Sequence, residues 1–280
     1  MKKIALVTDS TADLPDELSK KCLAHVIPLK ILFGEKSFVD GEISPKEFYR
    51  CLEQEEELPK TSQPSPEQFV SLYSMLLEEY QEVISIHISS GLSGTLNAAH
   101  LAKEKIKGAV HLVDSKTISL GLGLMVMEAS KAIKEGLGSV QVLDKLQQAR
   151  NSIETLFTLN TLEYLQKGGR IGRVSGFMGT LLNIKPVIRV GDDGVYQNFC
   201  KVRSQEKALK SIVKAFQDFA GKKTNIKFAV AHGSAPQAGL YLKEELENAF
   251  QKPAEMFAQV GAVIGAHTGP GTVGAAIQLE

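Results

Sequence analysis

The chain has 280 residues and carries 32 lysines and arginines against 32 aspartates and glutamates, so its formal net charge is zero. This balance argues against a protein that binds nucleic acid over its whole surface, and 43% hydrophobic with 23% charged residues argues against disorder. Three widely spaced cysteines without a CxxC pair argue against a disulfide framework or a zinc finger, and no apolar stretch approaches the roughly 18 residues of a membrane-spanning helix.

The first half of the chain alternates short apolar runs, rich in β-branched residues, with longer stretches of helical periodicity. Ser139 is expected to cap the last predicted helix. Strands that alternate with helices predict a mostly parallel sheet covered on both faces. The predicted strands are 3–9, 26–33, 82–89 and 109–115, and the predicted helices begin near Pro15, Pro45 and Pro66 and span 96–107, 121–135 and 140–154.

The second half has a more mixed pattern. The turn from Gly191 to Gly194 favours an antiparallel hairpin, and the glycine-rich segment 261–274 shows no helix core. We expect an α/β protein of two domains in a reduced cytoplasm, with a parallel-sheet N-terminal domain at residues 1–153 and a mixed-sheet C-terminal domain at 154–280. The predicted strands here are 155–160, 184–190, 195–202 and 226–232, and the predicted helices are 205–219 and 237–250.

Common nucleotide and metal motifs are absent from the sequence. There is no GxxxxGK[ST], no GxGxxG after a predicted strand and no HExxH. The segment GLSGT at 91–95 falls short of the GxSxG nucleophile elbow because Thr95 stands where the last glycine belongs. These absences exclude most common nucleotide and metal chemistries.

Small hydroxyl residues remain at the predicted ends of several strands, among them Ser93, and in the proline-rich loop 58–66, among them Thr61. Ligands of open parallel sheets bind at the carboxyl ends of strands, and a hydroxyl beside the free amides of a helix N-terminus can hold an anion. Ser93 lies between two glycines that allow close backbone approach, so we interpret it as a binding residue. The serines interpreted as helix caps are Ser65, Ser139 and Ser204.

Two histidines lie in unusual surroundings. His267 is embedded among alanines and glycines, so that either it approaches a ligand closely or its buried ring is satisfied by a backbone carbonyl. His87 alternates with two isoleucines on a predicted strand, and we interpret it as structural.

Laid out in order, the motifs of this chain resemble the DegV family of bacterial fatty-acid-binding proteins, the FakB-like group. The resemblance runs from end to end of the chain. The sequence departs from the family pattern at Leu96, in the helix that follows GLSGT (91–95), where the family leads us to expect an aromatic residue. The segments that carry it are VTDSTADLP (7–15), TSQPSP (61–66), ISSGLSGT (88–95), VDSKTISLGLG (113–123), LEYLQKGGRIG (162–172), LLNIKPVI (181–188), AHGSAP (231–236) and GAHTGPGTVG (265–274).

The resemblance implies that one long-chain fatty acid, such as palmitate, lies buried between the two α/β domains. Its carboxylate would meet Thr61, Ser93 and His267. The resemblance also implies that the chain catalyses nothing alone and holds no metal or cofactor. A separate kinase subunit would phosphorylate the bound carboxylate, and the acyl-phosphate would be carried to phospholipid synthesis. The supporting residues of the site would be Ser62, Gly94, Thr95 and Thr268.

Residues 161–203 hold seven basic side chains against three acidic ones, on a chain that is neutral as a whole. The simplest interpretation is a solvated face. The alternative is that Arg170, Arg173 and Arg203 meet the kinase or, transiently, an anionic membrane surface. Two apolar segments, 120–129 and 176–184, either line a tunnel for the acyl chain or belong to the ordinary core.

Two other functions stay open at this point. A lipid esterase or acyl hydrolase would use Ser93 as nucleophile and His267 as base, although the nucleophile elbow is broken and no acid is evident to orient the histidine. A regulatory module would bind a lipid and report it to a protein partner, and the sequence does not separate this function from that of a carrier.

Overall fold

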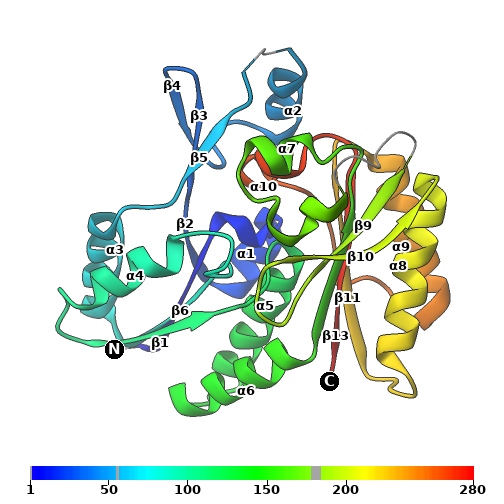
Figure 1. Ribbon diagram of the computed structural model, residues 1–280. Helices are drawn as coiled ribbons and strands as arrows, with labels where there is room; N and C mark the ends of the chain where they lie inside the picture. Colours follow the sequence, from blue (N-terminus) through cyan, green and yellow to red (C-terminus); the bar gives the residue numbers. More distant parts are fainter. Residues whose placement is uncertain (1, 55–56, 178–183) are drawn as a thin grey trace.

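The computed structural model describes residues 2–54, 57–177 and 184–280, which contain two main β-sheets (Figure 1). The first sheet has the order β2-β1-β6-β7, and all its neighbouring strands are parallel. The second has the order β10-β9-β8-β13-β11-β12; β11 and β12 are parallel and the other neighbours are antiparallel. The predicted fold class, a parallel N-terminal sheet and a mixed C-terminal sheet, is confirmed. The strands are β1 (Lys2–Asp9), β2 (Ala24–Ile27), β6 (Tyr80–His87), β7 (Ala109–Asp114), β8 (Ile153–Thr158), β9 (Lys185–Val190), β10 (Tyr196–Val202), β11 (Ile226–Gly233), β12 (Met256–Gln259) and β13 (Thr272–Leu279).

Helices cover both faces of the first sheet, which explains why its strands read as continuous apolar runs. Along β1, successive side chains enter two different cores. Ala5 and Val7 pack with α3 and α4, whereas Ile4 and Leu6 pack with α5 and α6. These helices are α3 (Pro66–Glu79), α4 (Thr95–Lys103), α5 (Leu120–Lys134) and α6 (Ser139–Asn151), and α1 (Asp16–Cys22) lies beside α5.

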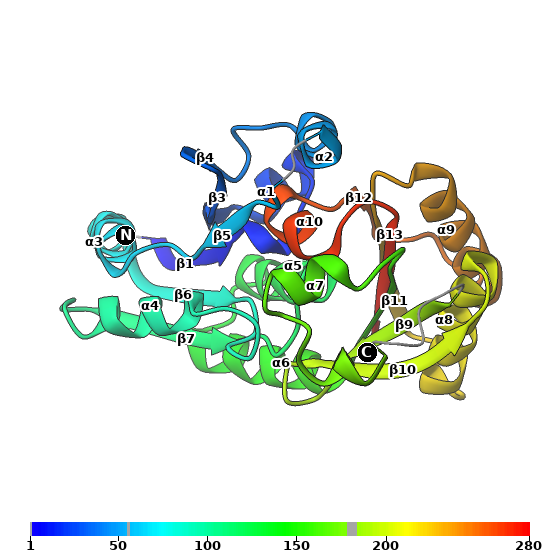
Figure 2. The ribbon, with the colours of Figure 1, turned by 45° about the horizontal axis from the view of Figure 1, so that its top comes forward.

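Helix α5 lies between the two sheets (Figure 2). It contacts β1 and β6 on one side and β11 and β13 on the other, and 11 of its 15 residues are buried. A helix that is apolar all round is expected in such a position. Helices α8 (Gln205–Ala220) and α9 (Pro236–Phe250) cover the opposite face of the second sheet.

A small lobe made of α2, β3, β4 and β5 packs against helix α10 (Figure 2). The rings of Phe48 and Tyr49 lie so close to Gly265 of α10 that a side chain at residue 265 would overlap them. The lobe therefore sets β5 beside α10, far along the chain. These elements are β3 (Lys30–Phe33), β4 (Lys36–Val39), α2 (Pro45–Gln54), β5 (Lys60–Ser62) and α10 (Ala262–Thr268).

Three sequence-based predictions of local structure are wrong. Residues 26–33 are not one strand, because Pro28 lacks an amide hydrogen and separates β2 from β3, which belong to different sheets. The glycine-rich segment 261–274 contains α10, whose glycines allow close packing rather than preventing a helix. Gly138 occupies the N-cap of α6, and Ser139 is the first helical residue.

The predicted caps Ser65 and Ser204 accept hydrogen bonds from the third amide of their helices. Strand β8, the first strand of the second sheet along the chain, begins at Ile153, next to the proposed domain boundary between residues 153 and 154. None of the helices in residues 2–54, 57–177 and 184–280 is long and apolar enough to cross a membrane. Cys22, Cys51 and Cys200 are unpaired.

Candidate functional site

Ser93 lies in the loop that joins β6 to α4, at the carboxyl end of the first sheet. The backbone amide of Ser93 donates to the carbonyl of Ser89 over 3.1 Å, which closes the loop into a tight turn. Ser93 Oγ lies 2.9 Å from Thr95 Oγ1 and accepts a 3.3 Å hydrogen bond from the Thr95 amide. Ser93 is half-buried and Thr95 is buried at the start of α4, so the Ser93 hydroxyl stands beside the free amides of a helix N-terminus.

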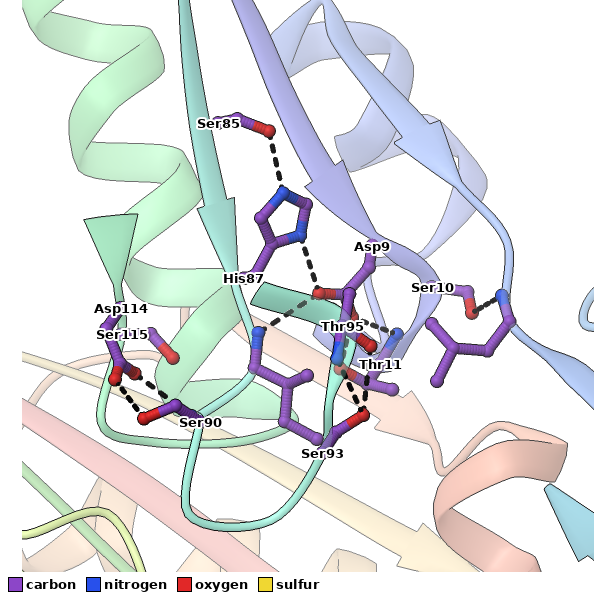
Figure 3. Close-up of polar contacts among 12 residues, drawn as sticks. Asp9, Ser10, Thr11, Ser85, His87, Ser90, Ser93, Thr95, Asp114 and Ser115 are labelled. Atoms are coloured by element: carbon purple, nitrogen blue, oxygen red, sulfur yellow. Dashed lines mark hydrogen bonds and ion pairs between the residues drawn. The ribbon is translucent and has the colours of Figure 1, made fainter. Parts of the chain in front are cut away.

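A buried aspartate, which the sequence analysis did not identify as important, anchors the start of this loop (Figure 3). Asp9 is fully buried and accepts hydrogen bonds from the amides of Ile88, at 3.0 Å, and Thr11, at 3.1 Å. His87 Nδ1 lies 2.9 Å from the same carboxylate, and its Nε2 lies 2.7 Å from Ser85 Oγ. His87 is fully buried, as expected for a structural histidine. The sequence feature that could have identified Asp9 is its position as a charged residue at the end of the predicted buried strand 3–9.

Thr61 of β5 and His267 of α10 meet directly: Thr61 Oγ1 lies 2.7 Å from His267 Nε2. Burial, with a contribution from the nearby Arg170 guanidinium, lowers the pKa of His267 from 6.5 to about 4, so the ring is neutral at pH 7. His267 Nδ1 is buried and has no hydrogen-bond partner among the described residues. Gly168 passes so close to this nitrogen that a side chain there would overlap it.

Thr61, Ser93 and His267 line one small cavity of about 30 Å³, which we call the polar cavity. A second cavity of about 40 Å³, the apolar cavity, lies between the start of α5 and the inner face of the second sheet. The two are adjacent, because Ile118, Tyr196 and Ile264 line both. The other residues of the polar cavity are Leu29, Ile88, Leu92, Arg170 and Val263.

The three arginines proposed to meet a partner, Arg170, Arg173 and Arg203, do not lie together in one setting. Arg170 is half-buried in the wall of the polar cavity, where its Nη1 donates to the Gly168 carbonyl over 2.7 Å and its Nε to the Leu92 carbonyl over 3.4 Å. Arg173 is exposed and pairs with Asp193 at 2.7 Å, and Arg203 is exposed just after β10. The place of Arg170 in the cavity wall was missed, although the flanking glycines of GGRIG hinted at close backbone approach.

The other predicted residues take different positions. Gly94 contacts the side chain of Gln63, which brings the loop of Ser93 against the segment that follows Thr61. Ser62 is exposed on β5, and Thr268 lines the apolar cavity rather than the polar one. Of the two candidate tunnel segments, Leu120 lines the apolar cavity, whereas residues 178–183 lie outside the described residues.

Two aspartates hold the N-terminal end of the helix that carries His267. Asp13 accepts hydrogen bonds from Ser119 Oγ at 2.5 Å and from the Gly261 amide at 2.9 Å, and burial raises its pKa to about 7. Burial likewise raises the pKa of Asp40 to about 6. Hydrogen bonds from the Ser10 side chain and from the first amides of α10 act in the opposite direction and partly offset this rise. In the described part of the chain, no three His, Cys, Asp or Glu side chains are arranged to hold a metal ion.

The chain is similar to known proteins over almost its whole length. Residues 3–280 match the family described as "Uncharacterised protein, DegV family". A DegV domain-containing protein of Clostridium acetobutylicum is 36% identical over 280 residues, which is 99% of each chain. A fatty-acid-binding DegV family protein of Thermus thermophilus superposes with a TM-score of 0.94 at 38% identity, over 99% of this chain and 100% of that one. DegV of Bacillus subtilis, a fatty-acid-binding protein, gives 0.91 at 32% identity over all of both chains. The chain therefore belongs to the DegV family.

Proposed function

We propose that the protein binds one long-chain fatty acid, with the carboxylate in the polar cavity and the acyl chain in the apolar cavity. The observation that carries this proposal is that Thr61, Ser93 and His267 line a single cavity that adjoins an apolar one. The fatty-acid-binding relatives of Thermus thermophilus and Bacillus subtilis support it, because each covers this chain almost completely.

Burial of the acyl chain supplies the main driving force. Each CH₂ removed from water contributes about 0.8 kcal/mol, so some 15 methylenes contribute about 12 kcal/mol before ordering costs. Each cavity, at about 30 or 40 Å³, is only the size of a water molecule and is therefore too small for a long acyl chain. The acyl chain must separate the side chains that meet between the two cavities. Ile118, Tyr196 and Ile264 are the residues that border both cavities, and we expect them to move when the acyl chain enters.

Neutral donors satisfy the carboxylate in this proposal. The hydroxyls of Thr61 and Ser93 and an N–H of His267 donate to its oxygens, since a buried anion without donors is strongly disfavoured. The Arg170 guanidinium in the cavity wall adds a favourable charge, while its Nε and Nη1 donate to the backbone carbonyls of Leu92 and Gly168. Such a setting holds the carboxylate ionised without a bidentate ion pair that would occupy both of its oxygens.

We propose further that a separate cytoplasmic kinase subunit phosphorylates the bound fatty acid. A carboxylate oxygen forms a bond to the γ-phosphorus of ATP while the bond from that phosphorus to the β,γ-bridging oxygen breaks and ADP leaves. Because the ionised carboxylate is itself the nucleophile, this chain needs no catalytic base, and its part is to bind and present the substrate. The chain then carries the acyl-phosphate towards phospholipid synthesis, and the exposed Arg173 and Arg203 meet the kinase or, briefly, an anionic membrane surface.

The competing hydrolase receives little support from the geometry. Ser93 Oγ pairs with Thr95 Oγ1 and His267 Nε2 pairs with Thr61 Oγ1, so the two groups do not form a nucleophile and base pair in this structure. A Ser-His-Asp sequence of hydrogen bonds does occur, in Ser85, His87 and Asp9, but all three side chains are fully buried.

Reconstitution tests the proposal. The protein is loaded with radiolabelled palmitate and mixed with a bacterial fatty-acid kinase, ATP and magnesium, and any acyl-phosphate is trapped with hydroxylamine as the hydroxamate. The carrier predicts hydroxamate that requires this chain, ATP and kinase together. Palmitate binding without hydroxamate, with a kinase shown to act on another carrier, would contradict the kinase step and favour a regulatory lipid-binding module. Labelling of Ser93 by a fluorophosphonate probe would favour the hydrolase.

A further inference from the structure

The turn between β9 and β10, residues 191–194, packs directly against the loop that carries Ser93. Gly194 has a φ of +78°, and a side chain on it would overlap Ser89 Oγ. On the other side of the same contact, a side chain on Gly91 would lie 2.6 Å from a methyl carbon of Val195. The backbone of the turn and the backbone of the loop are therefore in contact at Gly194 and Gly91. Glycine permits such a close approach because it has no side chain.

Ser89 links this contact to Ser93. Its side chain faces Gly194, and its carbonyl accepts the amides of Leu92, at 3.0 Å, and Ser93, at 3.1 Å. Ser89 Oγ also accepts the Gly91 amide at 3.1 Å. A displacement of Ser89 thus moves the backbone on which the Ser93 hydroxyl is mounted. The turn belongs to the second sheet and the loop to the first, so the contact crosses between the two halves of the protein.

The same turn is tied to the exposed segment that contains Arg173, in the short helix η2 (Gly172–Phe177). One carboxylate oxygen of Asp193 lies 2.7 Å from Arg173 Nη1, and the other accepts the Val195 amide at 3.3 Å. Both side chains of the ion pair are largely exposed, so its intrinsic contribution to stability is small and an acidic surface can compete for the arginine. Arg173 is therefore connected to Ser93 through Asp193, Gly194 and Ser89.

We propose that the 191–194 turn positions Ser93, and that an acidic protein surface that takes Arg173 from Asp193 acts on the bound carboxylate through this turn. The inference rests on the proposed fatty-acid site and adds a route by which a docked kinase loosens the hold of Ser93 on its substrate. In this account Gly194 and Asp193 are positioning residues, and neither touches the fatty acid.

The first test compares Gly194→Ala with Gly136→Ala. Gly136 also has a positive φ, +85°, but a side chain there meets open space, so the control carries the same backbone strain without the contact. Palmitate labelled with ¹³C at its carboxyl carbon reports the hydrogen bonding of the head group by NMR. Gly194→Ala should shift the bound carboxyl resonance and weaken palmitate binding about tenfold, the size expected when one hydrogen bond to a charged group is misaligned. Gly136→Ala should leave both at wild-type values, and equal behaviour of the two variants overturns the proposal.

The second test removes the ion pair and keeps the turn. Asp193→Asn retains an oxygen for the Val195 amide and loses the charge that holds Arg173, and Asp218→Ala breaks a different exposed pair, with Lys214, as the control. Hydrogen exchange of the Leu92 and Ser93 amides should become severalfold faster in Asp193→Asn alone. Unchanged protection overturns the coupling. The hydrogen-exchange measurement uses ligand-free protein, so its result does not depend on whether the protein binds a fatty acid. Failure of the proposed function would be seen separately in the NMR experiment: the carboxyl resonance of palmitate would stay at its free position when wild-type protein is added.

Discussion

Thr61 Oγ1 and His267 Nε2 lie 2.7 Å apart although the two residues are 206 positions apart in the sequence. The contact joins the small lobe of α2, β3, β4 and β5 to helix α10, which the lobe covers with the rings of Phe48 and Tyr49. One wall of the polar cavity is thus assembled from the two ends of the chain. If the proposed fatty acid binds here, substitutions at these two residues affect its carboxylate directly, and substitutions in the lobe act through the packing behind them.

Thr61→Val keeps the shape of the side chain and removes its hydroxyl. A hydrogen bond to a charged group is worth about 1.5–3 kcal/mol, and a water molecule that takes the place of the lost hydroxyl recovers part of it. The free energy of fatty-acid binding should therefore weaken by about 1–2 kcal/mol. Thr61→Ser, which retains the hydroxyl, should bind within a factor of about three of wild type. Isothermal titration with palmitate measures both, and equal affinities for the valine and serine variants would contradict the assignment.

Ser93→Ala should affect the chemistry more than the binding. The loss of one donor should weaken palmitate binding by about 1–2 kcal/mol, and hydroxamate formation with the kinase should fall further because the carboxylate is no longer held in one orientation. Ser71→Ala is the control, since Ser71 is exposed on α3 and its hydroxyl donates to the Glu67 carbonyl. Unchanged phosphorylation in Ser93→Ala would rule out the proposed head-group site.

Gly168→Ala should disturb His267 without touching the ligand. A methyl group at this position overlaps His267 Nδ1 and lies 2.9 Å from the Tyr164 carbonyl, so the ring must move. Gly138→Ala adds the same methyl group where nothing lies within 4 Å. We expect about a tenfold loss of palmitate affinity in the first variant, a change of 1.4 kcal/mol, and none in the second. Wild-type affinity in Gly168→Ala would show that His267 takes no part in binding.

The stability of the ligand-free protein should depend on His267 in acid. The pKa of His267 is about 4 in the folded protein and 6.5 when unperturbed, so the folded state binds this proton more weakly than the unfolded state. Its contribution is fully present above about pH 6.5 and is lost as the pH falls towards 4, by roughly 2 kcal/mol at pH 5. Urea denaturation at pH 7 and pH 5 should show a larger loss for wild type than for His267→Gln. Parallel losses would contradict the lowered pKa.

Asp13 should give the opposite dependence. Its pKa is raised to about 7 in the folded protein, so its contribution is present below the unperturbed value of 3.8 and is lost as the pH rises to about 7. Asp13→Asn should therefore flatten the fall in unfolding free energy between pH 5 and pH 8 by roughly 3 kcal/mol, leaving the smaller part due to Asp40. An unchanged slope in denaturation experiments at the two pH values would contradict this assignment.

The sequence predicts the first sheet and most helices well because their signals are local. The apolar runs of β1 and β6 follow from burial on both faces, and the hairpin of β9 and β10 follows from its turn residues. Helix α10 was missed because glycines usually argue against a helix. Gly265 is needed there to let the rings of Phe48 and Tyr49, more than 200 residues earlier, pack against the helix. Strand β3 was predicted but joined to β2, because the break at Pro28 was not recognised. Strand β5 was missed because Pro59 and Pro64 border it and its partner, β3, lies outside the main sheets.

The candidate site shows the same division between local and distant information. Ser93 stands out locally through its glycine neighbours and His267 through the alanines and glycines around it, although two interpretations of His267 stayed open. Thr61 was one of several hydroxyl candidates until the resemblance to the family pointed to it. Nothing in the sequence pairs their side chains, since the 2.7 Å contact depends on how the small lobe packs on α10. The wall position of Arg170 likewise depends on the fold of residues 168–177 beside the Ser93 loop.

Native mass spectrometry of the protein as purified tests the central claim most directly, by comparison with the mass of the denatured chain. The account predicts one noncovalent adduct with the mass of a C16 or C18 fatty acid, released on denaturation, and displacement of that adduct by added isotope-labelled palmitate. A protein that carries no adduct after repeated preparations, and that takes up neither added palmitate nor oleate, would contradict the account.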